Sequence, residues 1–347
     1  MSDPIAQGLQ LASNAARLGW YSGLGWLLGR EGRRHEAIPR YRPERPVPSR
    51  AELMSDLAGL LARDAELARD GLLPADVPFT HGVGDHLGRV RAMFQDLPET
   101  VARRSAREVA TAARQPDAES MPDYFRQDFH FQTGGYLSED SARLYDVQVE
   151  TLFNGSAAAM RRATLRPIAE HLRGRDQRRA SLLDVACGTG RLLRDIRLAF
   201  PGLNLTGLDL SRPYLEEARR HLQGLRGATW IAANAEAIPL PDASQDIVTS
   251  VFLFHELPPQ VRRKVAAEMA RVLAPGGLLV IVDSLQMGDR PEWDGLIEAF
   301  PHRFHEPYYR HYAIDDLDGM LSAAGLAPQA TFTAFLSKVM VRRKAAG

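Results

Sequence analysis

Residues 181–193, SLLDVACGTGRLL, decide the fold: an apolar run leads into a glycine-containing turn and then into helix-like sequence. Asp184 lies within the apolar run, and Gly188 and Gly190 lie in the turn. Turns of this kind between a strand and a helix usually hold a nucleotide, because the glycine backbone and the first N–H groups of the helix can approach a ligand closely. The stretch therefore predicts a strand, a turn and a helix that bind a nucleotide-like molecule.

The turn departs from the pattern that binds dinucleotides. That pattern is Gly-x-Gly-x-x-Gly, whereas Leu193 occupies the third glycine position here. A carboxylate at Asp184 would also repel a pyrophosphate. S-adenosylmethionine carries an amine and a sulfonium but no phosphate, so it removes the conflict. An NAD(P)-dependent oxidoreductase is therefore the weaker of these two enzyme hypotheses.

After residue 180 the sequence alternates apolar runs with helix-like segments. Strands are predicted at 181–187, 203–210, 228–234, 246–254 and 277–285, and helices at 190–199, 212–224, 259–273 and 314–324. Near-continuous apolar strands separated by helices indicate a parallel sheet covered on both faces. The last two apolar runs, 330–335 and 338–344, are joined too tightly for a helical crossover and predict an antiparallel hairpin near one edge.

Polar and aromatic residues stand at the ends of the later strands. Asp209 ends the second strand, where a carboxylate can accept hydrogen bonds from both ribose hydroxyls. Asn234 ends the third strand, where its amide can pair with the adenine amino edge and the N–H of Ala235 with a ring nitrogen. Phe252 to His255 border the crevice at the switch point of the sheet. Each polar residue alone also fits a loop cap or a turn, but together they predict one cofactor site.

Four stretches, LLDVACGTG, LTGLDLS, ANAEAIPLPDASQDIVTS and RVLAPGGLLVIVDS, resemble in order the motifs of class I S-adenosylmethionine-dependent methyltransferases. They are most similar to the ubiquinone/menaquinone C-methyltransferase branch, over roughly residues 140–345. The resemblance implies an α/β fold, with a Rossmann-like, seven-stranded, mostly parallel sheet of order 3-2-1-4-5-7-6, strand 7 antiparallel, and helices on both faces.

The resemblance also implies S-adenosyl-L-methionine as the cofactor. The residues expected to contact it are Asp184, Ala186, Gly188, Gly190, Asp209, Leu210, Asn234, Ala235 and Phe252. Asn234 is a departure from the family pattern, because many relatives carry aspartate there. An amide can still accept a hydrogen bond from the adenine amine.

Residues 1–120 lie outside the resemblance and are expected to form an N-terminal helical extension with an Arg/Pro-rich linker. Apolar residues at helical spacing predict helices at 51–72 and at roughly 85–114. The polar stretch QPDAESMPD then marks the boundary to a methyltransferase domain at 121–347. Within that domain, 121–175 is expected to be a helical cap or lid and 180–345 the catalytic sheet.

The segment 18–28, LGWYSGLGWLL, is apolar but too short to span a bilayer, and no secretory signal is expected. The sequence that follows it is rich in arginine and proline. Residues 18–50 therefore suit a peripheral contact with an anionic membrane. The favoured interpretation is a helix that packs on its own domain or on a second subunit, as in a homodimer.

The charge balance bears on partners and location. Lys+Arg and Asp+Glu each number 43, so the formal net charge is +0 and no global field favours nucleic acid. The single cysteine, Cys187, excludes an internal disulfide framework and a cysteine-based zinc site. A cytoplasmic location and a small-molecule substrate are expected.

Methyl transfer is an in-line displacement at a carbon that the sulfonium activates, so alignment and desolvation supply much of the catalysis. The acceptor, expected to be small and aromatic or lipophilic, must also lose a proton to a general base. His255 is the candidate base, because histidine titrates near neutral pH; the alternative is a histidine that only shapes the pocket. Glu256 either orients His255 or supplies negative charge at the start of the next helix.

Two aromatic segments are candidates for the acceptor pocket. The segment 301–312, PHRFHEPYYRHY, follows the fifth strand, where this family commonly builds its pocket. The segment 124–138, YFRQDFHFQTGGYLS, contains His130 and a Gly-Gly hinge and predicts a lid, with interdomain packing as the alternative. The pocket residues expected are Tyr136, Tyr145, His255, His305, Tyr308 and Tyr309.

A metal site was weighed for the first of these segments. Its candidate ligands are His302, His305, Glu306 and His311. The segment has no His-x-x-x-His pair and Pro307 interrupts it, so no metal is expected there. A hypothesis from another functional class is a non-catalytic, methyltransferase-like partner protein, against which the intact cofactor motifs argue.

Overall fold

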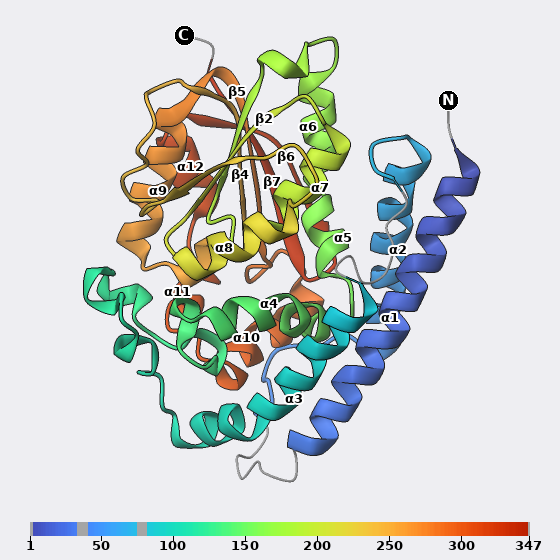
Figure 1. The fold of residues 1–347 in the computed structure, drawn as a ribbon, viewed down its shortest axis with the longest axis vertical. Coiled ribbons are helices and arrows are strands. Elements are labelled where there is room, and N and C mark those ends of the chain that lie inside the picture. The colour runs from blue at the N-terminus through green and yellow to red at the C-terminus, as the bar shows by residue number, and fades with distance from the viewer. Residues whose placement is uncertain (1–2, 33–40, 75–81, 346–347) are drawn as a thin grey trace.

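The centre of the molecule is a seven-stranded sheet of order β3-β2-β1-β4-β5-β7-β6 (Figure 1). The computed structural model describes residues 3–32, 41–74 and 82–345. The strands are β1 (Ser181–Val185), β2 (Asn204–Asp209), β3 (Thr229–Ala232), β4 (Gln245–Val251), β5 (Leu273–Ser284), β6 (Leu326–Ala334) and β7 (Ser337–Lys344). β7 pairs antiparallel with β5 and β6, and the other neighbours are parallel. The predicted sheet order and terminal hairpin are thus confirmed.

Both faces of the sheet are buried because successive side chains of a strand point to opposite faces. On β1, Leu182 belongs to one hydrophobic core and Leu183 to the other, and both are 0% exposed. Ile247 and Val248 on β4 divide in the same way. This double burial explains why the strands show as near-continuous apolar runs.

Helices surround the sheet on both faces and across one end (Figure 1). They are α1 (Pro4–Gly32), α2 (Arg50–Arg69), α3 (Val83–Ala106), α4 (Glu139–Leu152), α5 (Ala157–Arg162), α6 (Leu165–Leu172), α7 (Arg191–Ala199), α8 (Arg212–His221), α9 (Pro259–Val272), α10 (Asp294–Arg303), α11 (Tyr309–Tyr312) and α12 (Leu317–Ala323). Ser138 caps α4, and its side chain accepts a hydrogen bond from the Ser141 backbone N–H at 3.1 Å.

Some element boundaries differ from the sequence predictions. β5 begins at Leu273 rather than at residue 277, because its first residue pairs with Gln245 across an irregularity in β4. α3 ends at Ala106 rather than near 114, because Arg107 adopts a left-handed conformation with φ 55°. α10 was not predicted from the sequence, and only its last three residues belong to the pocket segment 301–312; Pro301 in its last turn obscures the helical pattern.

The N-terminal helices share hydrophobic cores with the rest of the molecule. Leu57, Leu60 and Leu61 of α2 belong to the same hydrophobic core as Leu182 of β1. The segment 18–28 lies within α1, where its buried residues pack with α3 and α4. The first helices and the sheet therefore share cores.

The outward face of α1 differs from its inward face. Ile5 is 75% exposed, Trp26 60% and Leu9 59%, whereas Gln10 and Asn14 are buried. None of the described helices has both the length and the apolarity to cross a membrane. The outer face of α1 is thus apolar surface on a helix that is anchored through polar residues.

The segment between α3 and α4 consists of short 3₁₀ turns, with little regular helix. These are η1 (Ala112–Arg114), η2 (Ala118–Ser120), η3 (Asp123–Phe125), η4 (Phe129–Phe131) and η5 (Gly135–Leu137). Asp128 fixes the segment, because its carboxylate accepts hydrogen bonds from the backbone N–H groups of Thr111 and Ala112 at 2.9 and 2.6 Å. The segment predicted as a lid is therefore irregular, and the hydrogen bonds of Asp128 hold it in place. We refer to residues 107–138, between α3 and α4, as the strap.

Candidate active site

The turn after β1 has the backbone that its sequence predicts. Ala186, Gly188 and Gly190 all have positive φ, at 55°, 53° and 73°. A Cβ on Gly190 would lie 2.8 Å from the Cβ of Ala218 on α8, so this glycine permits close helix packing. A Cβ on Gly188 would meet nothing within 4 Å. Gly188 thus faces open space, where a ligand can approach the backbone.

Asp184 is buried in the sheet, with 2% of its surface exposed. It accepts a hydrogen bond from Thr249 Oγ1 at 2.7 Å. Burial raises the pKa of Asp184 to about 7, the Thr249 hydrogen bond lowers it and the nearby Asp209 raises it. A positive charge placed nearby would favour the ionised form. Asp184 therefore fits the cationic end of S-adenosylmethionine.

Asp209 joins the end of β2 to the glycine turn. Its Oδ2 accepts a hydrogen bond from the Gly188 N–H at 2.7 Å, and its Oδ1 from the Ser211 N–H at 2.8 Å. Burial raises the pKa of Asp209 to about 6, against the lowering effect of these backbone hydrogen bonds. A carboxylate has about four acceptor positions, so Asp209 keeps capacity for ribose hydroxyls.

Asn234 lies where the adenine was predicted, but its side chain is already engaged. Its Oδ1 accepts from the Glu236 N–H at 2.9 Å, and its Nδ2 donates to Glu236 Oε1 at 3.1 Å. Tyr124, from η3 of the strap, donates to the same Glu236 Oε1 at 2.8 Å. The turn interpretation thus has geometric support, and contact with adenine stays a prediction.

The remaining cofactor candidates lie at strand ends. Leu210, Ala235 and Phe252 are each half-buried. Phe252 follows β4 with a φ of 59°, and its ring stacks against Phe153 at a centroid distance of 5.8 Å. A positive φ in an aromatic residue is uncommon and marks local strain, which is often found at functional sites.

His255 is buried and oriented by a residue that the sequence analysis missed. Its Nδ1 lies 2.6 Å from Asp283 Oδ1, and Asp283 Oδ2 accepts from the Phe254 N–H at 2.7 Å. Glu256 Oε1 is 4.0 Å from His255 Nε2, so Asp283 rather than Glu256 orients the ring. Asp283 lies near the end of β5, the same position that singled out Asp209 on β2.

The pKa of His255 bears on its predicted role. Burial acts to lower it, but the charge and hydrogen bond of Asp283 more than offset this and raise the pKa to about 9. Without a ligand, His255 is therefore protonated at neutral pH. The contact between Nδ1 and Asp283 fixes the orientation of the ring, and Nε2 is the ring nitrogen that Asp283 does not hold.

Most of the predicted pocket residues lie together. Tyr136, Tyr145 and Tyr308 belong to one aromatic cluster, which also includes Phe125, Phe129 and Tyr214. Tyr309 lies beside His255, with ring centroids 5.9 Å apart. His305 instead joins the two aromatic segments, with Nε2 3.0 Å from Gln127 Oε1. The strap and the segment 301–312 thus meet across the aromatic cluster.

The histidines weighed as metal ligands in 301–312 diverge. The His302 ring stacks on Tyr41 at 3.7 Å, and His311 Nδ1 lies 3.1 Å from Arg262 Nη1. Within the described ranges, these two do not join Glu306 in a metal-sized cluster.

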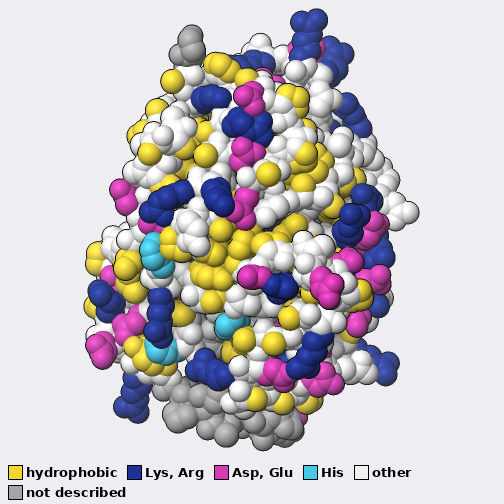
Figure 2. Space-filling view, turned by 90° about the vertical axis from the view of Figure 1, so that its left-hand side faces the viewer, with side chains coloured by type: hydrophobic (Ala, Val, Ile, Leu, Met, Phe, Trp, Pro, Cys, Tyr) yellow, Lys and Arg dark blue, Asp and Glu magenta, His cyan; other side chains and the backbone are white. Residues whose placement is uncertain are grey.

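Figure 2 shows the side of the molecule where α9, α11 and the strap lie, with apolar side chains gathered across its middle.

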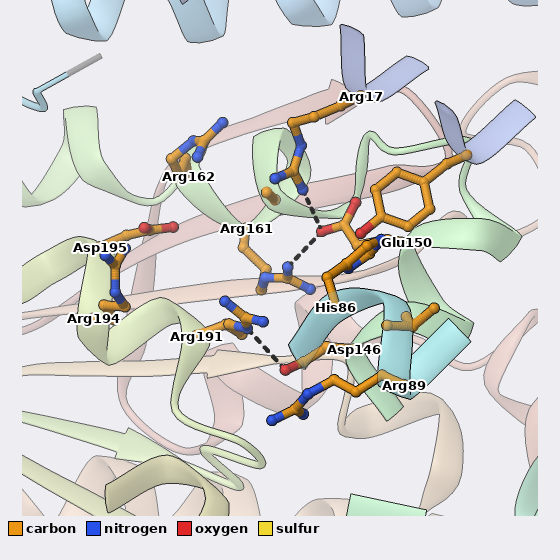
Figure 3. A pocket seen from close by; sticks show the side chains of 13 residues that line it. Arg17, His86, Arg89, Asp146, Glu150, Arg161, Arg162, Arg191, Arg194 and Asp195 are labelled. Atoms are coloured by element: carbon orange, nitrogen blue, oxygen red, sulfur yellow. Dashed lines mark hydrogen bonds and ion pairs between the residues drawn. The ribbon is translucent and has the colours of Figure 1, made fainter. Parts of the chain in front are cut away.

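A pocket lined by charged side chains lies where α1, α3, α4, α5 and α7 meet (Figure 3). Arg17 of α1 and Arg161 of α5 both pair with Glu150 of α4, at 3.0 and 2.9 Å. Arg191, the first residue of α7, pairs with Asp146 of α4 at 2.8 Å. These opposite charges brace the start of α7 against α4, a network that the sequence analysis did not detect.

Comparison with known proteins shows which proteins the chain resembles. Residues 182–277 match the family model described as Methyltransferase domain. A demethylmenaquinone methyltransferase of Thermus thermophilus is 38% identical over 104 residues, which are 29% of this chain and 46% of that protein. A ubiquinone/menaquinone biosynthesis C-methyltransferase of Methylobacterium nodulans is 34% identical over 166 residues, 47% of this chain and 63% of that protein.

The chain spans less than two thirds of the length of either of these relatives. The crystal structure of a SAM-dependent methyltransferase from Aquifex aeolicus matches with a TM-score of 0.39 and 20% identity, covering 51% of this chain and 87% of that one. The sheet order is the one that the resemblance to class I S-adenosylmethionine-dependent methyltransferases implies, and residues 182–277 match the methyltransferase-domain family. Within this class, the chain resembles the ubiquinone/menaquinone C-methyltransferase branch, and S-adenosyl-L-methionine is the cofactor that the family implies.

Proposed function

We propose that the protein is an S-adenosylmethionine-dependent methyltransferase acting on a small aromatic or lipophilic molecule. The observation that carries the proposal is Asp184, a carboxylate buried at the end of β1 with a raised pKa, beside the turn of Gly188. A buried carboxylate of this kind is stabilised by a cationic ligand. When bound, S-adenosylmethionine supplies a positive charge and an activated methyl group.

Each proposed cofactor contact follows from the geometry of one residue. The carboxylate of Asp209 accepts hydrogen bonds from the ribose. The same carboxylate accepts from the backbone N–H of Gly188 and so holds the glycine turn in place. The backbone of Gly188 lies against the cofactor, since no protein atom fills the space beside it. The adenine lies near Asn234, whose Oδ1 is 3.4 Å from the hydroxyl of Tyr124 of the strap.

His255 is proposed to take the proton of the acceptor. Asp283 holds Nδ1, which leaves Nε2 for the substrate. A cationic ligand beside the ring opposes its protonation and favours the neutral imidazole that a base requires. The aromatic cluster of Tyr136, Tyr145 and Tyr308 offers ring faces and edges to an aromatic acceptor. The relatives named for menaquinone and ubiquinone biosynthesis agree with a ring of this kind.

Calorimetric titration of the full-length protein tests the cofactor. S-adenosylmethionine should bind and NADH should not. Asp209→Ala should weaken S-adenosylmethionine binding at least about tenfold, because it removes ribose hydrogen bonds and the anchor of Gly188. Asp117→Ala, which changes an exposed carboxylate, is the matched control and should bind normally. Binding of NADH alone, or unchanged affinity in Asp209→Ala, would overturn the proposal.

The acceptor is tested in the same preparation with methyl-labelled cofactor and a cell extract. Label should enter an organic-soluble or aromatic metabolite, identified by mass spectrometry. With that metabolite, His255→Ala should lose about 10²-fold or more in turnover while its cofactor affinity changes little. His302→Ala, whose ring stacks on Tyr41, serves as control. Full turnover in His255→Ala would assign that histidine a role in pocket shape only.

A further inference from the structure

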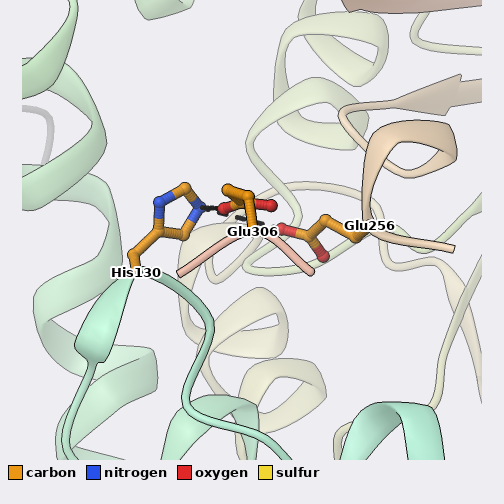
Figure 4. Close-up of side chains that lie close together, drawn as sticks. All are labelled: His130, Glu256 and Glu306. Atoms are coloured by element: carbon orange, nitrogen blue, oxygen red, sulfur yellow. Dashed lines mark ion pairs between the residues drawn. The ribbon is translucent and has the colours of Figure 1, made fainter. Parts of the chain in front are cut away.

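Three side chains from distant parts of the chain converge beside the aromatic cluster (Figure 4). His130 comes from η4, Glu256 from η7 (Phe254–Glu256) and Glu306 from the loop before α11. His130 Nε2 lies 2.9 Å from Glu306 Oε1 and 3.8 Å from Glu256 Oε1. One ligand atom from each residue lies within 4.8 Å of the other two. No other such group occurs in residues 3–32, 41–74 and 82–345.

Glu306 is the member whose environment calls for a ligand. Its side chain is 0% exposed. Neither of its carboxylate oxygens has a hydrogen-bond partner of acceptable geometry, although His130 Nε2 is close. Burying a carboxylate costs several kcal/mol unless hydrogen bonds or a cation compensate. The compensation that the structure places beside Glu306 is the ion pair with His130, and a divalent cation would take the place of the imidazole proton between these two groups.

The backbone holds His130 against the two carboxylates. His130 and Phe131 have φ values of 55° and 60°, a left-handed conformation that is unfavourable for residues other than glycine. The backbone N–H of His130 donates to the carbonyl of His305 at 3.2 Å, which ties the strap to the segment that carries Glu306. This strained arrangement brings the imidazole to the carboxylates from a segment remote in sequence.

The charges also fit a divalent cation. Two carboxylates and one neutral imidazole carry a charge that one divalent ion balances. Tyr136 donates its hydroxyl hydrogen to Glu256 Oε1 at 2.5 Å, the kind of outer hydrogen bond that orients a metal-binding carboxylate. The distances between the ligand atoms are also near those of a metal site. Metal–ligand bonds of about 2.1 Å place neighbouring ligand atoms roughly 3 Å apart, and His130 Nε2 lies 2.9 Å from Glu306 Oε1 and 3.8 Å from Glu256 Oε1.

We propose that His130, Glu256 and Glu306 form a binding site for a divalent first-row metal ion such as Mn²⁺, Fe²⁺ or Zn²⁺. One nitrogen and two carboxylate ligands suit these ions and leave coordination positions for water or an oxygen of a substrate. The site uses Glu306 but not the neighbouring histidines of its segment. It goes beyond the proposed function, because metal binding by this cluster does not require methyl transfer.

Metal binding by the full-length protein tests the proposal. The protein is stripped with EDTA, titrated calorimetrically with MnCl₂ and with ZnCl₂, and its retained metal is measured after gel filtration by mass spectrometry. One ion per chain should be retained. Glu306→Gln and Glu256→Gln keep the side-chain shape and should each weaken binding by about 100-fold or more. His302→Gln and His311→Gln are matched controls and should bind as the unsubstituted protein does.

Circular dichroism of every variant in EDTA establishes whether it is folded. If Glu306→Gln does not fold, the test rests on Glu256→Gln, whose position is less deeply buried. Absence of retained metal in the unsubstituted protein, or glutamate variants that bind metal as tightly as the unsubstituted protein does, would overturn the proposal. S-adenosylmethionine affinity is measured on the same EDTA-treated samples. A failure of the metal site is thereby distinguished from a failure of the proposed cofactor.

Discussion

At the scale of single residues, the two glycines of the turn after β1 are needed for different physical reasons. Gly188 faces open space, which agrees with the predicted approach of a ligand to the backbone. Gly190 lies against Ala218 of α8, so its lack of a side chain serves helix packing. The sequence pattern gives both glycines the same role, because spacing alone cannot show which neighbour a Cβ would meet.

This difference makes a stability prediction. Gly190→Ala should lower the free energy of unfolding by roughly 2–4 kcal/mol, because it adds both an unfavourable φ and a close contact. Gly224→Ala is the matched control, because Gly224 has φ +81° and nothing within 4 Å of its Cβ position. It should cost only about 1–2 kcal/mol. Urea unfolding at one temperature measures both values.

The contact itself is isolated with Ala218→Gly. In that background, Gly190→Ala should cost less than in the unsubstituted protein, because the nearest atom is gone and only the backbone of residue 218, with its Cα at 3.1 Å, stays close. An unchanged cost of Gly190→Ala in both backgrounds would show that backbone strain alone accounts for it. The double-mutant cycle thus separates two reasons for one glycine.

At the scale of elements, the strands were predictable and the strap was not. Burial on both faces makes β1 and β4 continuous apolar runs, which a sequence shows directly. The strap between α3 and α4 has no periodicity, since it is built from short 3₁₀ turns.

The candidate site divides in the same way. Asp184 and Asp209 follow from their positions on strands, and Asp283 could have been found by the same signal. His130 and Glu306 meet only through the tertiary fold, across 176 positions of sequence, so local pattern cannot pair them.

Contacts between helices supply a pH-dependent term. Asp64 of α2 accepts hydrogen bonds from Arg162 of α5 at 2.6 and 2.8 Å, and from Gln10 and Asn14 of α1. Burial acts to raise the pKa of Asp64, but Arg162 and the amide donors more than offset this and lower it. The stabilisation is therefore fully present above the unfolded-state pKa of about 4 and is lost as pH falls through the lower, folded-state pKa.

Asp64→Asn should lower the free energy of unfolding at pH 7 by roughly 3–5 kcal/mol, because it removes the buried carboxylate with which Arg162 pairs. Asp70→Asn, which affects a more exposed pair with Arg166, should cost below about 1 kcal/mol. Denaturant unfolding between pH 7 and pH 3 provides the measurement. Stability of the unsubstituted protein should fall more steeply below about pH 4 than that of Asp64→Asn. Equal slopes would remove Asp64 from the acid-sensitive groups.

At the scale of the whole molecule, the first helices complete the structure around the sheet. The leucines of α2 share a core with β1, and Arg17 of α1 pairs with Glu150 of α4. Gly155, after α4, lies so close to α1 that a Cβ would be 2.8 Å from the Arg17 carbonyl oxygen. The family resemblance does not cover α1 and α2, yet both helices pack against the part of the chain that it covers.

A chain that starts at residue 121 should therefore be much less stable than the full chain. It would expose the core that Leu57, Leu60 and Leu61 cover and leave Arg162 without Asp64, a loss of at least about 5 kcal/mol when these terms combine. Thermal unfolding with a dye that binds apolar surface measures the effect. Ile5→Ser with Leu9→Ser is the control, because both side chains are more than half exposed and should leave the melting temperature unchanged. If the shortened chain instead unfolds cooperatively at the full-length temperature and binds S-adenosylmethionine equally well, the first 120 residues are a separate domain. The shared cores would then contribute little to the stability of the sheet.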